Sequence, residues 1–214
     1  SRGELDIGEL EAILKTQPVK MVSVVHASNA LGTINDVSII IKLAHAHGAL
    51  VLVDGAQYVA NHQVNVTHLD ADFYVFSGHK LFAPYGIGVC YGKKSHLEKM
   101  PPYQGGGSMI HEVTFEKTTY HDIPHKFEAG TPNVEGAVGL GAAIEYIQKL
   151  GWDQIARHER ALLLSASERL SAIEGVRLIG TAPRKVPVVS FLIEGQHPSD
   201  VGQILDQANV AVRA

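Results

Sequence analysis

Short apolar runs alternate with segments of helical periodicity in the first half of the chain, and this alternation restricts the fold more than any other feature. The runs "VKMVSVVHAS", "ALVLVDG" and "ADFYVFSG" are too short for core helices, so each predicts a buried strand. The segments "DIGELEAILKT" and "NDVSIIIKLAHAHG" carry apolar residues at helical spacing, and Asn35 or Asp36 is expected to cap the second. Apolar strands separated by helices predict an α/β fold with a parallel sheet covered on both faces.

A fourth apolar run, "GIGVCYGK", follows the third after a short link from Lys80 to Gly86. A crossover between parallel strands needs a dozen or more residues, so this run is expected to lie antiparallel to its neighbour. The sequence therefore predicts a mixed, mostly parallel sheet.

The second half of the chain has a different rhythm. Residues 101–132 are rich in Gly, Pro, His and Thr and predict a long loop or arm. A helix is expected in "NVEGAVGLGAAIEYIQKLG", and a helix, strand and helix are expected after Gly151, in "WDQIARHERALLLSASERLSAIEG", "VPVVSFLIEG" and "PSDVGQILDQAN". We predict a larger domain over 1–150 and part of a smaller α+β domain over 151–214. The expected core stripe of the first helix after Gly151 comprises Ile155, Leu162, Leu163, Ala166, Leu170 and Ile173.

Composition excludes several classes of partner. The net charge is -4 and no dense Lys/Arg run occurs, which argues against nucleic acid and anionic membranes and favours a small-molecule ligand. No apolar stretch reaches the roughly 18 residues of a membrane helix. Cys90 is the single cysteine, so no internal disulfide is possible, and we expect a cytoplasmic protein.

Polar clusters follow the first three strands at their carboxyl ends, where α/β sheets usually bind ligands. They are "HASNALGT", "DGAQ" and "SGHK". A single cluster of this kind is more often a turn or a helix cap, and a single lysine there is more often solvated. The three clusters in this order are more informative than any one of them.

Together these clusters satisfy the requirements of pyridoxal 5'-phosphate (PLP). This cofactor needs a lysine amine to form an imine, a carboxylate to keep its pyridine nitrogen protonated, and donors for its phosphate. Lys80, Asp54 and the pair Ser77 and His79 can supply these groups. We therefore predict a PLP site.

Two amide side chains extend the predicted site. Gln57, three residues after Asp54, is placed to hydrogen-bond the phenolic oxygen of the cofactor ring. Asn29 is placed to reach the same oxygen or a substrate carboxylate. Loss of Asp54 is expected to harm the chemistry more than the binding of the cofactor.

The motifs "SNALGT", "DGAQ", "SGHKLFAPYGIGVCYGK", "QGGGSMIHEV" and "FEAGTPNVEG" resemble the cysteine desulfurases of the SufS and CsdA type, in the class V branch of fold type I PLP enzymes. The resemblance covers nearly the whole chain. It implies the large domain of a fold type I PLP-dependent transferase with part of its smaller domain, assembled as a homodimer. Lys80 would bond covalently to the cofactor, Asp54 would pair with the pyridine nitrogen, and Gln57 would contact the phenolic oxygen.

The resemblance also implies roles for more distant residues. Ser77 and His79 would bind the phosphate, and Thr131 of "AGTP" would reach the phosphate of the partner subunit's cofactor. Asn29 and Arg213 match family positions near the substrate carboxylate. An arginine suits this role because its planar guanidinium can hold a carboxylate with two hydrogen bonds.

The family pattern extends beyond this sequence at both ends. It includes an N-terminal portion with a further phosphate-binding loop and a histidine that stacks on the pyridine ring, and a C-terminal segment with the sulfur-accepting cysteine. We therefore expect the chain to be an internal part of a longer enzyme. Cys90 lies in an apolar run, and we interpret it as an inert buried residue rather than the nucleophile.

The expected activity of the longer enzyme is conversion of L-cysteine to L-alanine, with sulfur passing through an enzyme persulfide to an acceptor protein for iron-sulfur cluster assembly. One alternative is a selenocysteine lyase acting on L-selenocysteine, or another class V aminotransferase or lyase. A second alternative is a catalytically inactive dimerising domain. No metal site is expected, and we interpret His45 and His47 as residues of a helix end.

Overall fold

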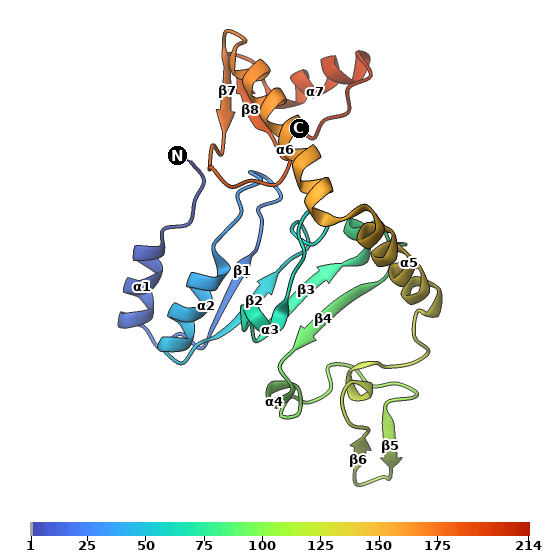
Figure 1. Cartoon of the computed structure of the whole chain (residues 1–214). Coiled ribbons are helices and arrows are strands. Elements are labelled where there is room, and N and C mark those ends of the chain that lie inside the picture. Colours follow the sequence, from blue (N-terminus) through green and yellow to red (C-terminus); the bar gives the residue numbers. More distant parts are fainter. Residues whose placement is uncertain (1) are drawn as a thin grey trace.

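The structure is a computed structural model that describes residues 2–214 (Figure 1). Its main sheet has four strands in the order β1-β2-β3-β4. Strands β1 to β3 are parallel, and β4 is antiparallel to β3. The predicted α/β class and the mixed, mostly parallel sheet are therefore confirmed. The strands are β1 (Met21–Val25), β2 (Leu50–Asp54), β3 (Phe73–Ser77) and β4 (Gly88–Gly92).

Two of the predicted helices pack beside β1 and β2. Helix α2 (Val37–Ala46) contacts both strands, and α1 (Ile7–Thr16) contacts α2. Each helix begins after an aspartate, Asp6 or Asp36, whose carboxylate accepts a hydrogen bond from an amide of the first turn. These caps satisfy amides that have no partner within the helix. The predicted cap at Asp36 is confirmed.

The hydrophobic core joins α2, the middle of the sheet and α5 (Val134–Leu150). Helix α5 passes close to the segment after β3, because a Cβ on Gly139 would lie only 2.5 Å from Pro84. A larger residue at 139 would therefore push α5 away from the sheet. The main buried side chains are Val37, Ile41, Ala44, Val51, Val53, Tyr74, Leu81, Leu140 and Ile147.

Strand β1 lies at the edge of the sheet and is more exposed than predicted. Met21 is 45% exposed and Val25 is 41% exposed. Alternate side chains of β1 face away from the core, and within residues 2–214 no strand pairs with its outer side. The prediction of a buried strand is wrong for this half of the β1 side chains.

Residues 101–133 form an arm, and the arm contains a hairpin that was not predicted. Figure 1 shows this hairpin beyond the end of β4, next to the short helix α4. Its two antiparallel strands contain an irregularity between Ile110 and Glu112. The strands are short, and the sequence around them carries no clear alternation of apolar and polar residues. The elements are α4 (Lys94–Leu97), β5 (Ile110–Val113) and β6 (Thr118–Tyr120).

A buried lysine fastens the arm to the rest of the chain. Lys126, in the 3-10 helix η2 (His125–Phe127), is only 9% exposed. Its Nζ donates to the backbone oxygens of Glu98, at 3.0 Å, and Met100, at 2.8 Å. Hydrogen bonds from a charged donor are worth more than neutral ones, so this contact holds the base of the arm against the segment after α4.

The C-terminal part consists of two helices, of 20 and 10 residues, and a two-stranded antiparallel sheet. Figure 1 places this sheet and the last helix on the side to which the β2 and β3 arrows point. The strand β7 was not predicted because its four residues, "VRLI", follow directly on a helical pattern. The elements are α6 (Trp152–Ser171), β7 (Val176–Ile179), β8 (Ser190–Ile193) and α7 (Pro198–Gln207).

The apolar stripe predicted for α6 is not a core stripe in this chain. No residue of α6 is buried, and Leu162 is 57% exposed, while Ile173 beyond its end is 54% exposed. Helix α6 packs against α5 and β7 along only part of its surface, so part of the stripe is exposed and the rest, including Ile155, is half-buried. Gly151, with a φ of +83°, separates α5 from α6. A domain boundary there, between 1–150 and 151–214, stays a prediction.

At the opposite end of the sheet from the carboxyl ends of β2 and β3, a buried carboxylate gathers several donors. Asp72, whose side chain is 3% exposed, accepts hydrogen bonds from the Val51 amide at 2.7 Å, His45 Nε2 at 2.8 Å and His96 Nε2 at 2.9 Å. Lys93 Nζ lies 3.2 Å from the same carboxylate. Burial raises the pKa of Asp72, but these hydrogen bonds together lower the pKa well below its usual range.

Replacing Asp72 with asparagine is expected to lower the free energy of unfolding at neutral pH by about 3 kcal/mol, because Lys93 loses a buried counter-charge and two histidine rings lose a carboxylate acceptor. In the original protein the depressed pKa makes this contribution complete above the ordinary aspartate pKa, about 4, and the contribution is lost as the pH falls below it. Urea denaturation at pH 7 and pH 3 measures both effects. Asp70→Asn, at an exposed partner of Lys93, is the control and is expected to cost about 1 kcal/mol or less. Equal stability of Asp72→Asn and the original protein at pH 7 would contradict the prediction.

Within the described residues 2–214, no helix combines the length and apolar character that crossing a membrane requires.

Candidate active site

The predicted cofactor residues follow β2 and β3 at the same edge of the sheet. Val25 at the end of β1 is in register with Asp54, and Asp54 is in register with Val75. Parallel strands end at one edge, so Asp54 and Ser77 both lie at this edge. The segments that carry Gln57, His79 and Lys80 continue directly from these two strand ends.

Lys80 is held in a short 3-10 helix, η1 (Gly78–Leu81), that begins directly after β3. The Gly78 amide donates to the Ile87 oxygen at 2.8 Å, and a Cβ on Gly78 would lie 2.7 Å from the Ile87 side chain. Glycine therefore allows the chain to turn tightly at this point. Phe82, with a φ of +62°, ends the helix in the left-handed conformation. Lys80 is thus fixed between two strands that pair with each other.

Asp54 is fixed by hydrogen bonds on both its backbone and its side chain. Its carboxylate Oδ1 accepts the Ala56 amide at 2.9 Å, and its backbone oxygen accepts the His26 amide at 2.7 Å. The next amide, that of Gly55, donates to the Val75 oxygen at 2.8 Å. The chain then enters a turn that contains Gln57.

The groups at this edge are available for a ligand. Across residues 2–214, none of the side-chain hydrogen bonds or ion pairs involves the side chain of Lys80, Gln57 or Ser77. His79 is exposed, and its ring stacks on that of Tyr85 with centroids 5.3 Å apart. This edge of the sheet therefore carries five kinds of polar group: an amine, a carboxylate, an amide, a hydroxyl and an imidazole. The set fits the aldehyde, the ring and the phosphate of PLP.

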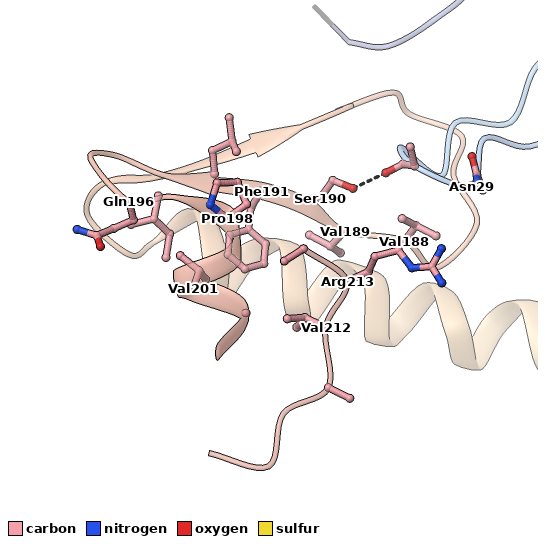
Figure 2. A pocket seen from close by; sticks show the side chains of 16 residues that line it. Asn29, Val188, Val189, Ser190, Phe191, Gln196, Pro198, Val201, Val212 and Arg213 are labelled. Atoms are coloured by element: carbon pink, nitrogen blue, oxygen red, sulfur yellow. Dashed lines mark hydrogen bonds between the residues drawn. The ribbon is translucent and has the colours of Figure 1, made fainter. Parts of the chain in front are cut away.

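A separate cavity of about 510 Å³ brings together Asn29 and Arg213, although 184 positions separate them in the sequence. Figure 2 shows both side chains at the same end of this cavity, with the Arg213 guanidinium directed toward the segment that carries Asn29. The Ser190 hydroxyl donates to the Ala30 oxygen, which ties β8 to the segment after β1. The lining residues do not include Lys80. The two predicted substrate residues thus share a cavity whose walls come from both halves of the chain.

Thr131 is exposed and lies in the arm, outside the main sheet to which Asp54 belongs. The Asn133 side chain donates to the Gly86 oxygen at 3.1 Å and also caps α5. This contact places the segment that carries Thr131 beside the turn that follows Lys80. The contact of Thr131 with the partner subunit's cofactor stays a prediction.

The interpretation of Cys90 as a buried residue is wrong. Cys90 lies in β4 as predicted, but its side chain is exposed because β4 is the other edge strand of the sheet. Partial burial raises the pKa of its thiol. A thiol with a raised pKa carries little thiolate at neutral pH. The raised pKa, rather than burial of the side chain, is therefore the argument against Cys90 as a nucleophile.

Sequence reasoning assigned no role to His26, which lies directly after β1 and donates its amide to Asp54. Its side chain is buried, at 7% exposure. The signal available in the sequence was a histidine that interrupts the apolar run "VSVVHAS" at the strand end. Its partners lie 32 and 48 positions away, at Tyr58 and Tyr74, so no local pattern reveals them.

Known proteins are similar in sequence to almost the full length of this chain. A protein named cysteine desulfurase from Synechococcus elongatus is 52% identical over 212 residues, which are 99% of this chain and 34% of that protein. A cysteine desulfurase from Dickeya dadantii is 49% identical over 212 residues, 99% of this chain and 51% of its own length. The chain thus spans about a third to a half of these relatives.

Solved structures share the fold. The apo structure of a cysteine desulfurase from Thermococcus onnurineus matches with a TM-score of 0.93 and 40% identity, covering 99% of this chain and 53% of that one. The cysteine desulfurase CsdA from Escherichia coli matches with a TM-score of 0.89 and 38% identity, covering 95% of this chain and 51% of that one. The family model described as aminotransferase class-V matches residues 1–214. The chain therefore belongs to the class V aminotransferase family.

Proposed function

We propose that this chain forms the cofactor-binding part of a PLP-dependent cysteine desulfurase. The observation that supports this most is the position of Lys80, fixed after β3 with no side-chain partner in the described chain, at the sheet edge that also holds Asp54. Relatives named cysteine desulfurase, at about half identity over 99% of the chain, support the choice of reaction. Class V family members depend on PLP.

In this proposal the residues at the sheet edge divide the tasks of binding the cofactor and moving a proton. Bound PLP supplies an electron sink for the negative charge that develops at the substrate α carbon. Lys80 would hold the cofactor through its amine, and the same amine, when free, would move the proton at the substrate α carbon. Asp54 keeps the proton on the pyridine nitrogen, and Gln57 donates to the phenolic oxygen. Ser77 and His79 hold the phosphate.

The substrate groups would be held by the second half of the chain as well as the first. Arg213 and Asn29 bind the carboxylate of L-cysteine, which agrees with their shared cavity. A cysteine thiolate of the longer protein attacks the substrate sulfur, so that L-alanine leaves and an enzyme persulfide remains for transfer to an acceptor protein. The protein would act in the cytoplasm as a homodimer, with Thr131 contributing to the partner subunit's site.

The test is a covalent labelling experiment on the purified chain and on the full-length protein. After addition of PLP, borohydride reduction and peptide mapping are expected to place the label on Lys80, and the full-length protein is expected to release alanine from L-cysteine. A label spread over exposed lysines such as Lys94 would contradict the proposal for the full-length protein. A comparison of L-cysteine with L-selenocysteine then identifies the preferred substrate.

A further inference from the structure

Three stacked rings lie behind the carboxyl ends of β1 and β2. The ring of His26 stacks on that of Tyr58, with centroids 3.5 Å apart and an angle of 11° between the planes. Tyr58 in turn stacks on His62, at 4.5 Å and 13°. His26 follows β1, whereas Tyr58 and His62 belong to the turn that follows Asp54. The stack therefore joins the end of one strand to the turn after its neighbour.

His26 also makes a side-chain hydrogen bond to the third strand. Its Nδ1 lies 3.0 Å from the hydroxyl of Tyr74, a β3 residue that is 2% exposed. The Tyr74 hydroxyl in turn packs directly on the residue after Asp54, because a Cβ on Gly55 would lie only 2.1 Å from it. A shift of the His26 and Tyr74 pair would therefore be passed on to the backbone at Asp54.

The pair carries no charge at neutral pH. Burial, with smaller contributions from the nearby His62 and Arg184, lowers the pKa of His26 to about 4. Burial also raises the pKa of Tyr74. A neutral imidazole and a phenol can share one hydrogen bond with either tautomer of the histidine.

We propose that His26 is a positioning residue for the cofactor ring. Through its stack on Tyr58 and its hydrogen bond with Tyr74, it fixes the end of β2 at Asp54 and the following turn, which carries Gln57. This inference rests on the proposed function, because the turn matters for catalysis only if Asp54 and Gln57 contact PLP. The simpler possibility is a core histidine that stabilises the fold and nothing else.

The two possibilities differ in how they affect the affinity for PLP. A contact that only stabilises the fold is lost equally from the cofactor-free and the cofactor-bound protein, so its loss leaves the PLP affinity of the folded protein unchanged. A contact that holds Asp54 and Gln57 in place changes that affinity. The PLP dissociation constant, measured where every variant is fully folded, therefore separates them.

The chain carries its own reporter of the turn. Trp152, the single tryptophan of these 214 residues, donates its indole N–H to the oxygen of Val59 at 3.2 Å, and Val59 follows Tyr58 directly. Movement of the turn therefore alters the surroundings of this indole. Its fluorescence emission reports the position of the turn even without cofactor.

The experiment compares Tyr74→Phe, His26→Phe and the double variant in the full-length protein. Each single variant leaves one buried polar group without its partner and is expected to weaken PLP binding about five- to tenfold. The same variants of the 214-residue chain, in which Trp152 is the single tryptophan, are expected to show a shift in its emission. The double variant removes both polar groups and is expected to bind PLP no more weakly than either single variant. Tyr146→Phe, at a tyrosine that is 58% exposed on α5, is the matched control and is expected to bind like the original protein. Circular dichroism is the check that all four variants are folded.

The outcomes separate this inference from the proposed function. If the original protein binds PLP at Lys80 and the His26 and Tyr74 variants bind it equally well, the inference is overturned and the proposed function stands. If the original protein does not bind PLP at Lys80, the proposed function fails. The positioning role toward PLP then fails with it, and the Trp152 emission decides whether His26 fixes the turn at all.

Discussion

Replacement of Lys80 with alanine in the full-length protein is expected to lower the rate of alanine release from L-cysteine by about four orders of magnitude. Lys80 has two tasks in the proposed mechanism, the covalent bond to the cofactor and the proton transfer at the substrate α carbon, and alanine can perform neither. No lysine next to it in η1 can take its place, because its neighbours are His79 and Leu81. Alanine release is measured by amino-acid analysis, and the covalent PLP label by peptide mapping.

A matched control distinguishes the role of Lys80 from a general effect of removing a lysine. Lys94→Ala removes an exposed ammonium group from α4, where its ion-pair partner is Glu98 at 3.7 Å. This variant is expected to keep the original rate. If Lys80→Ala retains a rate within about tenfold of the original protein, the assignment of Lys80 is wrong.

Replacement of Asp54 with asparagine is expected to lower kcat about a thousandfold, while the affinity for PLP falls by less than about tenfold. The asparagine oxygen can still accept the Ala56 amide, as Oδ1 of Asp54 does, so the turn is expected to keep its shape. An amide carries no charge and does not keep a proton on the pyridine nitrogen. The change therefore affects the chemistry more than the binding.

Steady-state kinetics and a PLP titration measure the two effects of Asp54→Asn separately. Asp206→Asn, at an exposed position of α7, is the control for loss of one negative charge and is expected to change neither. A loss of PLP binding as large as the loss of kcat would show that Asp54 mainly binds the cofactor, contrary to the prediction.

The main sheet could be predicted from the sequence because its information is local. Each of β1 to β4 is a short apolar run bounded by helical patterns or turns, and the length of the link from Lys80 to Gly86 fixed the direction of β4. The strand β7 and the hairpin β5–β6 were missed, since strands of three or four residues give too short a pattern. Their pairing depends on the partner strand more than on their own sequence.

Burial was harder to predict than secondary structure. The apolar stripe of α6 shows which face of the helix is apolar, but not how much of it another element covers, and within the described residues the cover is only partial. Cys90 and Val25 were likewise expected to be buried, and both are exposed because they belong to the two edge strands.

The candidate site shows the same division between local and distant information. The order of polar groups after β2 and β3 pointed to Lys80 and Asp54 without knowledge of the fold. Arg213 was identified only by the family resemblance, since its neighbour Asn29 is near the other end of the chain. His26 was missed, because the contacts that make it notable come from the turn after β2 and from β3.

Because Lys126 is buried only while the arm packs against the segment after α4, its accessibility to a protease reports whether the arm is docked there. Trypsin cleaves after lysine, and the arm carries Lys117 exposed in its hairpin turn and Lys126 buried against the oxygens of Glu98 and Met100. While the arm is docked, cleavage is expected after Lys117 but not after Lys126, although only nine positions separate them. A protease digest therefore distinguishes a docked arm from a released one, and it can follow the release of the arm under conditions in which the sheet stays folded.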